Sequence, residues 1–283
     1  MIRHGNLVAS FWKRLFGGGV WRGDDGSVAT RASAPVEMPH PSTFGWALPE
    51  GKLVYAIGDI HGRLDLLDAL LLKIEEDRAT RWGVSETYIV FLGDYVDRGF
   101  QSKAVLDFLV SYRPHNATPI FLRGNHEDLL LQFINDPMIA DLWLRVGGAA
   151  TLVSYGVDMH APEIAGDLLA ASDAFMRALP AEHRQFLEGL EASWQLGDYY
   201  FVHAGLRPGI PLDQQGHRDK TSIRQDFTLS GHNFGVCVVH GHTGVRKPEH
   251  NGTRIAVDTG AFATGKLTAV VLEGTEARFL STT

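Results

Sequence analysis

Short apolar runs alternate with segments of helical periodicity in the first half of the chain. Residues 63–80 and 102–113 carry apolar side chains at helical spacing, and Ser102 is expected to cap the second of these helices. Three unbroken apolar runs are typical of strands buried on both faces, namely LVYAI (53–57), YIVFL (88–92) and PIFL (119–122). Because strands and helices alternate, the pattern predicts an α/β fold (α+β in some schemes) with parallel central strands.

The second half of the chain predicts a helical segment followed by more strands. Residues from about 128 to 197 look mostly helical, and we predict that they form an inserted helical cap. Five later runs are expected to form a second sheet: YYFV (199–202), VCVVH (236–240), RIAV (254–257), LTAVVLE (267–273) and ARFL (277–280). The expected architecture is a two-sheet β-sandwich flanked by helices.

The N-terminal 48 residues differ from the rest in composition. Residues 17–48 are rich in Gly, Ser, Ala and Pro, which is typical of a linker. The apolar segment LVASFWKRLF (7–16) is interrupted by two basic residues and does not resemble a secretion signal. A short amphipathic helix at a membrane interface is the alternative to a plain extension. We predict an extension over residues 1–48 and one domain over residues 49–283.

Composition and charge exclude several classes of protein. The formal net charge of -7 argues against a nucleic-acid-binding surface. No apolar stretch approaches about 18 residues, so no transmembrane segment is expected. The single cysteine, Cys237, cannot form an internal disulfide, and its apolar surroundings VCVV predict a buried core residue. These features suit a protein of the reducing cytoplasm.

Five of the predicted strands are followed directly by polar clusters. The clusters are GDIHG (58–62), GDYVDRG (93–99), RGNHE (123–127), HAG (203–205) and HGHT (240–243). Single short motifs such as HAG are weak signals, whereas several charged residues after an apolar strand, as in GDYVDRG, are specific. In open α/β sheets, ligands bind beyond the carboxyl ends of the strands. We therefore expect the five clusters to meet in one place.

The residue types in these clusters predict a metal centre. Six candidate ligands offer carboxylate, imidazole and amide atoms and no thiolate: Asp59, His61, Asp94, Asn125, His203 and His242. This set suits Mn, Fe or Zn, and we expect two Mn²⁺ ions as the first choice, since six ligands are too many for one catalytic ion. Two such ions lie about 3.5–4 Å apart, share a carboxylate and turn a water between them into a nucleophile. We expect His240 to support a ligand rather than to bind metal.

Together the motifs resemble the metallophosphoesterases (the calcineurin-like superfamily) of the phosphoprotein phosphatase type. The resemblance covers residues from about 53 to 272. The segments WLRVGGAATLVSYG (143–156), SIRQDF (222–227) and VDTGA (257–261) are similar to the bacterial branch of that family. That branch contains serine/threonine protein phosphatases and symmetrical dinucleoside tetraphosphatases. The resemblance implies a dimetal site at the carboxyl ends of the strands.

The resemblance also implies how the ligands divide between the two ions. The first ion is bound by Asp59 and His61, and Asp94 bridges the two ions. The second ion is bound by the remaining three ligands, which are Asn125, His203 and His242.

Four further residues take catalytic or substrate-binding roles by the same resemblance. His126 resembles the general acid that protonates the leaving oxygen, and Asp97 resembles the carboxylate that orients it. Arg98 resembles an arginine that holds the phosphate, and Arg224 matches a second one. The family often has Trp before the Ile-Arg of that second motif, whereas this chain has Ser222, so the shape of the phosphate pocket is expected to differ.

Two substrate classes follow from these residues. We predict in-line hydrolysis of phosphoserine and phosphothreonine in a phosphorylated protein substrate. The alternative is symmetrical hydrolysis of a dinucleoside polyphosphate, which needs a more basic cleft. Residues 126–194 carry few basic side chains (Arg145, Arg177 and Arg184), which favours the first class. A catalytically inactive phosphoprotein-binding module is disfavoured because every ligand and the general acid are present.

Overall fold

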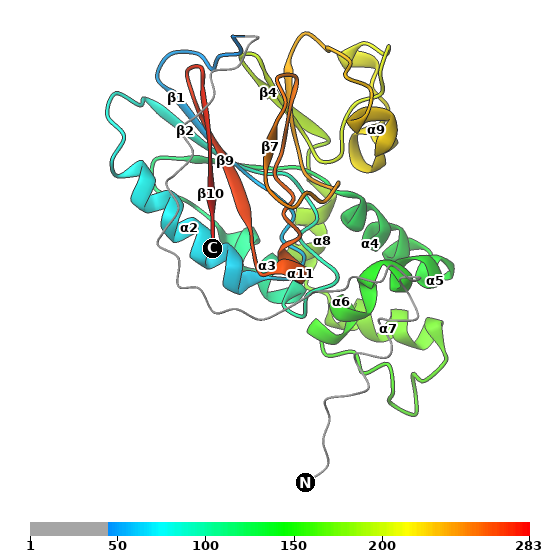
Figure 1. Ribbon diagram of the computed structural model, residues 1–283. Coiled ribbons are helices and arrows are strands. Elements are labelled where there is room, and N and C mark those ends of the chain that lie inside the picture. Colours follow the sequence, from blue (N-terminus) through cyan, green and yellow to red (C-terminus); the bar gives the residue numbers. More distant parts are fainter. Residues whose placement is uncertain (1–44) are drawn as a thin grey trace, which may run out of the picture. The chain divides into compact units, whose positions relative to one another are not determined.

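The computed structural model describes residues 45–283, which form two five-stranded sheets with helices on their outer sides (Figure 1). The first sheet has the order β10-β9-β1-β2-β3 and the second has the order β4-β5-β6-β8-β7. The strands are β1 (Lys52–Ile57), β2 (Glu86–Phe91), β3 (Thr118–Phe121), β4 (Ser193–Leu196), β5 (Tyr199–Val202), β6 (Cys237–His240), β7 (Glu249–His250), β8 (Arg254–Ala256), β9 (Thr268–Glu273) and β10 (Glu276–Ser281). This architecture confirms the predicted two-sheet α/β fold.

Strand β1 shows why an unbroken apolar run forms the centre of this fold. Its side chains alternate between the two faces of the sheet. Tyr55 and Ile57 pack in the core beneath α2 (Leu64–Arg78) and α3 (Ser102–Ser111), whereas Val54 and Ala56 pack in the core between the two sheets. Both faces are therefore buried, and both select apolar side chains.

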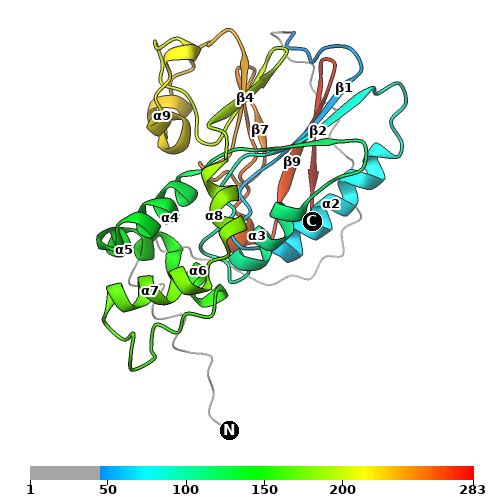
Figure 2. The ribbon, with the colours of Figure 1, turned by 180° about the vertical axis from the view of Figure 1, so that it is seen from behind.

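The central strands of each sheet are parallel, as predicted for the first sheet. In the first sheet β1, β2 and β3 run in the same direction, and in the second sheet β5, β6 and β8 do so. Their carboxyl ends bring the polar clusters of the sequence to one end of the sandwich. Helix α4 (Asn125–Asn135) starts directly at this end, and Figures 1 and 2 place α4 and the helices that follow it up to residue 178 below the sheets.

The prediction that residues 267–273 and 277–280 belong to the second sheet is wrong. Strand β9 pairs antiparallel with β1, and β10 pairs antiparallel with β9, so both extend the first sheet. The side chains of β9 alternate between two buried layers, with Val270 in the core between the sheets and Val271 in the core under the helices. An apolar run buried on both faces contains no information about which sheet it joins.

The prediction that Ser102 caps a helix is also wrong. Gln101 occupies the N-cap position of α3, and Ser102 is the first residue of the helix. The Ser102 hydroxyl instead accepts a hydrogen bond from the backbone N–H of Asp97 at 3.0 Å. The side chain that looked like a cap thus holds the loop that follows β2.

Short helices fill the segment between β3 and β4. They are α4, α5 (Ala140–Trp143), α6 (Ala149–Ser154), α7 (Leu168–Ala178) and α8 (Ala181–Glu188), with a 3-10 turn (Pro137–Ile139) and a π-helical turn (Leu144–Gly148) among them. Phe133, Trp143 and Phe175 from three of these helices pack together in the core that also covers the first sheet. We refer to residues 128–197, the predicted helical cap, as the cap segment. Its last residues are not helical as predicted, because β4 (Ser193–Leu196) joins the second sheet. The remaining helices are α9 (His217–Ser222), α10 (Gln225–Thr228) and α11 (Ala261–Thr264).

Three further predictions concern the N-terminal extension, membrane-spanning segments and the single cysteine. The predicted extension and its possible amphipathic helix fall almost wholly on residues 1–44, which lie outside the described residues. In residues 45–283, no helix is long and apolar enough to cross a membrane. Cys237 is buried as a free thiol in the core between the sheets, as its apolar surroundings predicted.

Replacing Ile255 should test the core between the sheets. Ile255 lies on β8 and is fully buried there, so Ile255→Ala is expected to lower the free energy of unfolding by about 2–5 kcal/mol. Ile255→Val should cost about 0.5–1.5 kcal/mol. Leu229→Ala, at a side chain that is 78% exposed, should stay within about 0.5 kcal/mol. Equilibrium urea unfolding measures all three, and equal losses for Ile255→Ala and Leu229→Ala would contradict this packing.

Candidate dimetal site

The six predicted ligands meet at the carboxyl ends of five parallel strands. Asp59 follows β1, Asp94 follows β2, and Asn125 follows β3 at the start of α4. His203 directly follows β5 and His242 follows β6. Contacts link the two sheets here, since the Asp59 carboxylate accepts a hydrogen bond from the backbone N–H of His242 at 3.1 Å. The structure therefore brings together residues that are up to 183 positions apart in the sequence.

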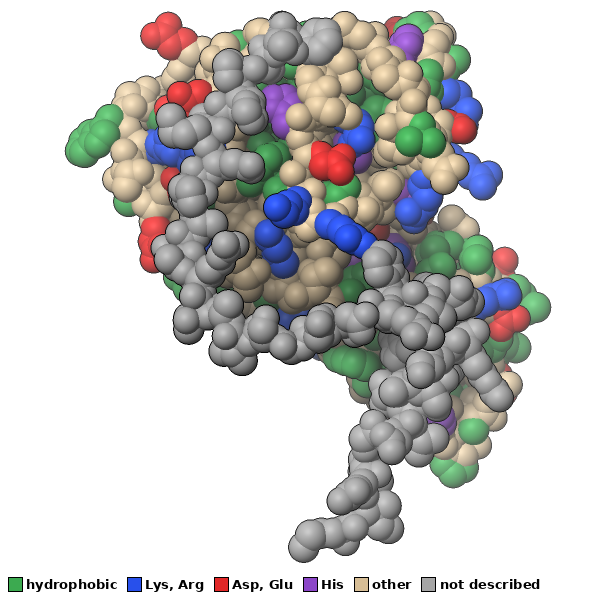
Figure 3. Space-filling view, in the orientation of Figure 1, with side chains coloured by type: hydrophobic (Ala, Val, Ile, Leu, Met, Phe, Trp, Pro, Cys, Tyr) green, Lys and Arg blue, Asp and Glu red, His purple; other side chains and the backbone are tan. Residues whose placement is uncertain are grey.

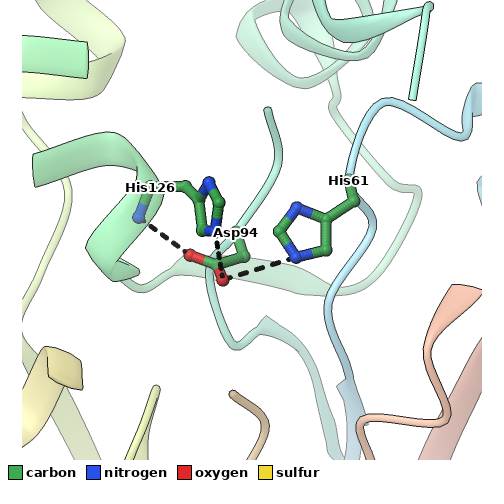
Figure 4. Close-up of side chains that lie close together, drawn as sticks. All are labelled: His61, Asp94 and His126. Atoms are coloured by element: carbon green, nitrogen blue, oxygen red, sulfur yellow. Dashed lines mark hydrogen bonds and ion pairs between the residues drawn. The ribbon is translucent and has the colours of Figure 1, made fainter. Parts of the chain in front are cut away.

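His61 points one ring nitrogen at two carboxylates. Its Nδ1 contacts the carbonyl oxygen of Val96 at 2.8 Å, so Nδ1 carries the proton and Nε2 keeps a lone pair. That Nε2 lies 3.5 Å from Asp94 Oδ2 and 4.0 Å from Asp59 Oδ2. Figure 4 shows the rings of His61 and His126 on either side of the Asp94 carboxylate. Among the described residues, His61 Nε2 is buried without a hydrogen-bonding partner, which fits a metal ligand.

His203 forms the centre of a second group of ligand atoms. Its Nδ1 contacts the carbonyl oxygen of Leu92 at 2.9 Å, which leaves Nε2 free to bind a cation. Nε2 lies 3.4 Å from Asp94 Oδ1, 3.3 Å from Asn125 Oδ1 and 3.2 Å from His242 Nδ1. Two nitrogens, an amide oxygen and a carboxylate oxygen that converge in this way match the ligand preferences of Mn, Fe or Zn. Asp94 contributes one oxygen to each group, as a bridging carboxylate must.

Backbone strain is concentrated at this site. In the described part of the chain, six non-glycine residues have φ in the left-handed region, and five of them are predicted site residues: His61, Asp94, Asp97, Arg98 and His242. Only Asn116, of a type that tolerates this conformation, lies elsewhere. Such conformations persist where the surroundings fix them, and they gather at functional sites.

The electrostatics of the site show an excess of negative charge. Burial and the carboxylates of Asp258 and Asp94 raise the pKa of Asp59 well above its usual range. Burial also acts to raise the pKa of Asp94, but His203 and His126 outweigh it and hold that pKa well below its usual range. Burial lowers the pKa of His203, yet Asp94 and Asp59 raise it to about 10. Buried carboxylates that compete for positive charge in this way are stabilised by bound cations.

Asp59 is a better candidate than His126 for the first ion. By distance alone, His61, Asp94 and His126 could hold one ion, and Asp94, His203 and His242 could hold another. However, His126 Nδ1 contacts Asp97 at 2.7 Å, and its Nε2 lies 3.1 Å from the guanidinium of Arg98. Because Nε2 of His126 already lies next to the positively charged Arg98, it is a poor ligand for a metal cation, whereas the Asp59 carboxylate attracts one.

His126 and Asp97 form the hydrogen-bonded pair that the sequence predicted. The side chains of both residues are almost fully buried. Burial lowers the pKa of His126, but Asp94 and the hydrogen bond to Asp97 outweigh it, so the pKa is raised. Because arginine only donates, Nε2 accepts from Arg98 and Nδ1 donates to Asp97 in this arrangement.

The two predicted phosphate-binding arginines contact different residues of the site. Arg98 follows Asp97 in the loop after β2, and its guanidinium lies 4.9 Å from the ring centroid of Phe262. Arg224 is exposed and donates to the carbonyl oxygen of His242 at 3.4 Å. Planar guanidinium groups suit bidentate binding of phosphate oxygens.

Sequence reasoning missed Glu127 and Asp258. The Glu127 carboxylate accepts the backbone N–H groups of Gly124, Asp94 and Tyr95 at 2.8–3.0 Å and so joins two ligand-bearing loops. Burial and Asp94 raise the pKa of Glu127 to about 7. Asp258 follows β8 and is also buried, with a raised pKa. The signal for Asp258 was available, because it follows the apolar run RIAV as the predicted ligands follow theirs.

His240 does not face the metal ligands. Its ring packs against Phe227 with a centroid separation of 5.1 Å, and its Nε2 lies 3.3 Å from the guanidinium of Arg254. It therefore supports the outer face of the second sheet. The sequence led us to expect that His240 supports a metal ligand, but the side-chain contacts of its ring are with Phe227, Arg254 and the carbonyl oxygen of Gly241.

Comparisons with known proteins find related sequences and similar folds. The sequence model of the calcineurin-like phosphoesterase family matches residues 52–265. The chain is 28% identical over 234 residues to an asymmetrical bis(5'-nucleosyl)-tetraphosphatase PrpE of Halalkalibacterium halodurans, an alignment that covers 76% of this chain and 87% of that protein. Among solved structures, a provisionally assigned diadenosine tetraphosphatase gives a TM-score of 0.55 at 21% identity, covering 86% of this chain and 96% of that one. A cold-active protein-tyrosine phosphatase of a psychrophilic Shewanella species gives 0.51 at 19% identity, covering 86% and 85%.

Proposed function

The chain belongs to the calcineurin-like phosphoesterase family, and on that premise we propose that it hydrolyses phosphoserine and phosphothreonine in proteins with two divalent metal ions, preferably Mn²⁺. When bound, the two ions would neutralise charge on the phosphate and make a nucleophile available at neutral pH. Asp59 and His61 would hold the first ion, and Asn125, His203 and His242 would hold the second. Asp94 would bridge them.

The observation that carries this proposal is the position of His126. An alkoxide of serine or threonine is a poor leaving group and needs a proton as the P–O bond breaks. The His126–Asp97 hydrogen bond, buried and 2.7 Å long, supplies an oriented imidazole for that purpose. The guanidinium of Arg98 contacts Nε2 of the same ring. When a phosphate binds this guanidinium, Nε2 would be released from the contact and could carry the proton for the leaving oxygen. A nucleotide leaving group is more acidic and needs such a donor less.

A dinucleoside tetraphosphate is the second candidate substrate. The PrpE relatives bear that activity in their names, and they are named as asymmetrical enzymes. Figure 3 shows Lys and Arg side chains gathered near the middle of one face, and the loop that follows His242 carries exposed Arg246 and Lys247. Phe262, half-buried beside Arg98, offers an aromatic surface to a base. These groups could bind a longer polyphosphate.

A comparison of two substrates tests the proposal. The Mn²⁺-loaded protein is given a phosphothreonine peptide and diadenosine tetraphosphate in parallel, and kcat/KM is measured for each. We expect the value for the peptide to be at least about tenfold higher, which corresponds to about 1.4 kcal/mol of transition-state stabilisation. A higher value for the dinucleotide would reject the protein phosphatase, and the nucleotide products would then distinguish symmetrical cleavage to two ADP from asymmetrical cleavage to ATP and AMP.

A further inference from the structure

The turn between α5 and α6 lies against the loop that follows Asp94. The carbonyl oxygen of Gly147 accepts a hydrogen bond from the backbone N–H of Arg98 at 3.1 Å. A Cβ on Gly147 would lie 2.8 Å from Cγ of Arg98, and the φ of 123° at this position also excludes other residues. A Cβ on the adjacent Gly148 would lie 2.4 Å from the indole of Trp143. The two glycines therefore let this turn of the cap segment approach the catalytic loop closely.

The cap segment holds both oxygens of the Asp97 carboxylate. The indole N–H of Trp143 donates to Oδ2 at 2.9 Å, and the hydroxyl of Thr151 donates to Oδ1 at 2.6 Å. The Thr151 oxygen also accepts from the backbone N–H of Asp97 at 3.0 Å. Oδ2 is the same oxygen that contacts Nδ1 of His126. Rotation of the carboxylate would therefore break hydrogen bonds on both sides at once.

The backbone of the catalytic loop needs this support. Asp97 and Arg98 are consecutive and have φ values of 71° and 68°, which is unfavourable for residues with a side chain. Such a pair persists only where neighbouring groups fix it. Trp143 is itself held by Phe133 and Phe175, whose ring centroids lie 4.5 and 6.1 Å from its own. The indole is thus a rigid donor and not a mobile one.

We propose that Trp143 and Thr151 are positioning residues for the general acid, which they act on through Asp97. This inference rests on the proposed function. As the P–O bond breaks, the proton on Nε2 of His126 passes to the leaving oxygen, while the proton on Nδ1 remains hydrogen-bonded to Asp97. Without a hydrogen-bond donor from the cap segment, the Asp97 carboxylate would rotate, and the His126 ring would no longer be oriented toward the leaving oxygen. The cap segment is therefore part of the catalytic apparatus as well as a wall of the site.

Two aryl phosphates separate this role from a purely structural one. p-Nitrophenyl phosphate releases a stabilised phenolate and depends little on a proton donor, whereas phenyl phosphate releases a more basic phenolate and depends on it. Trp143→Phe keeps most of the ring but loses the N–H. We expect kcat on phenyl phosphate to fall about 10- to 100-fold, and kcat on p-nitrophenyl phosphate to fall no more than about threefold. Bound metal should stay unchanged.

Matched variants control for the loss of an indole donor and for folding. Trp46→Phe also removes an indole hydrogen bond, to the carbonyl oxygen of Gly252 at 2.6 Å, and should leave the ratio of the two rates unchanged. Thr151→Val should change the ratio as Trp143→Phe does, and Thr151→Ser, which keeps the hydroxyl, should restore it. The threonine pair tests the proposal even where the Trp143→Phe protein does not fold.

Several outcomes would overturn the inference. An unchanged ratio of kcat on phenyl phosphate to kcat on p-nitrophenyl phosphate, with or without a loss on both substrates, would show that Trp143 and Thr151 support the site in general and not the general acid. A fall in bound metal would show the same. The His126→Asn/Trp143→Phe double variant should hydrolyse phenyl phosphate no more slowly than His126→Asn alone, because residues that act as a unit are not additive. A further slowing would contradict the route through His126. If the wild-type protein hydrolyses neither ester, the proposed function fails and this inference falls with it.

Discussion

Asp94→Asn should abolish hydrolysis and release bound metal. In residues 45–283, Asp94 is the carboxylate shared by both groups of candidate ligands, with Oδ2 3.5 Å from His61 Nε2 and Oδ1 3.4 Å from His203 Nε2. Asparagine replaces one of these oxygens by an amide nitrogen, which does not bind a cation. A catalytic metal ion contributes several kcal/mol to the transition state, and about 4 kcal/mol is a thousandfold in rate. We expect kcat to fall by at least that factor.

The measurement is kcat together with the metal content of the dialysed protein. The wild-type protein should retain two equivalents of added Mn²⁺ and the Asp94→Asn protein should retain no more than one. Asp65→Asn is the matched control, because it makes the same change at a side chain that is 49% exposed on α2 and pairs with Arg63. It should keep both the metal and the activity. An Asp94→Asn protein with two bound ions would refute the bridging role.

The candidate metal ligands could be identified from the sequence because the sequence shows where each strand ends. A buried parallel strand reads as an unbroken apolar run, and the run stops where the backbone leaves the sheet. The first polar residues after it must lie at the carboxyl edge, which is how Asp59 and Asp94 could be placed together without a structure. The same rule would have found Asp258 after β8.

Other features depend on tertiary contacts that no local pattern contains. Trp143 and Thr151 lie 46 and 54 residues after the carboxylate that they hold. The resemblance of their segment (143–156) to the bacterial branch did not imply a contact with Asp97. The side chain of Ser102 looked like a cap, but it is turned toward Asp97. In the same way, β9 joins the first sheet because the free edge of β1 accepts it. In each case the decisive contact is with residues far away in the sequence.

His126→Asn should separate proton donation from metal binding. The substitution keeps a polar side chain that can still donate to Asp97, but it removes the group that protonates the leaving oxygen. General acid catalysis contributes about 10²–10⁴-fold, so kcat on a phosphothreonine peptide should fall within that range. The loss on p-nitrophenyl phosphate should be much smaller, because its leaving group needs little protonation. Both bound metal ions should remain, since neither group of predicted ligands includes His126.

The contrast with Asp94→Asn decides whether the two roles are distinct. His232→Asn provides the matched control at an exposed histidine whose ring packs against Phe234, and it should behave as the wild type. Loss of metal in His126→Asn to the same extent as in Asp94→Asn would place the imidazole among the ligands, as its distances to His61 and Asp94 would permit. If the His126→Asn protein retains its metal and its loss of kcat grows as the leaving group becomes more basic, His126 is the residue that protonates the leaving oxygen. In that case the hydrogen bonds from the cap segment to Asp97 gain a function, because only an oriented acid requires an oriented carboxylate.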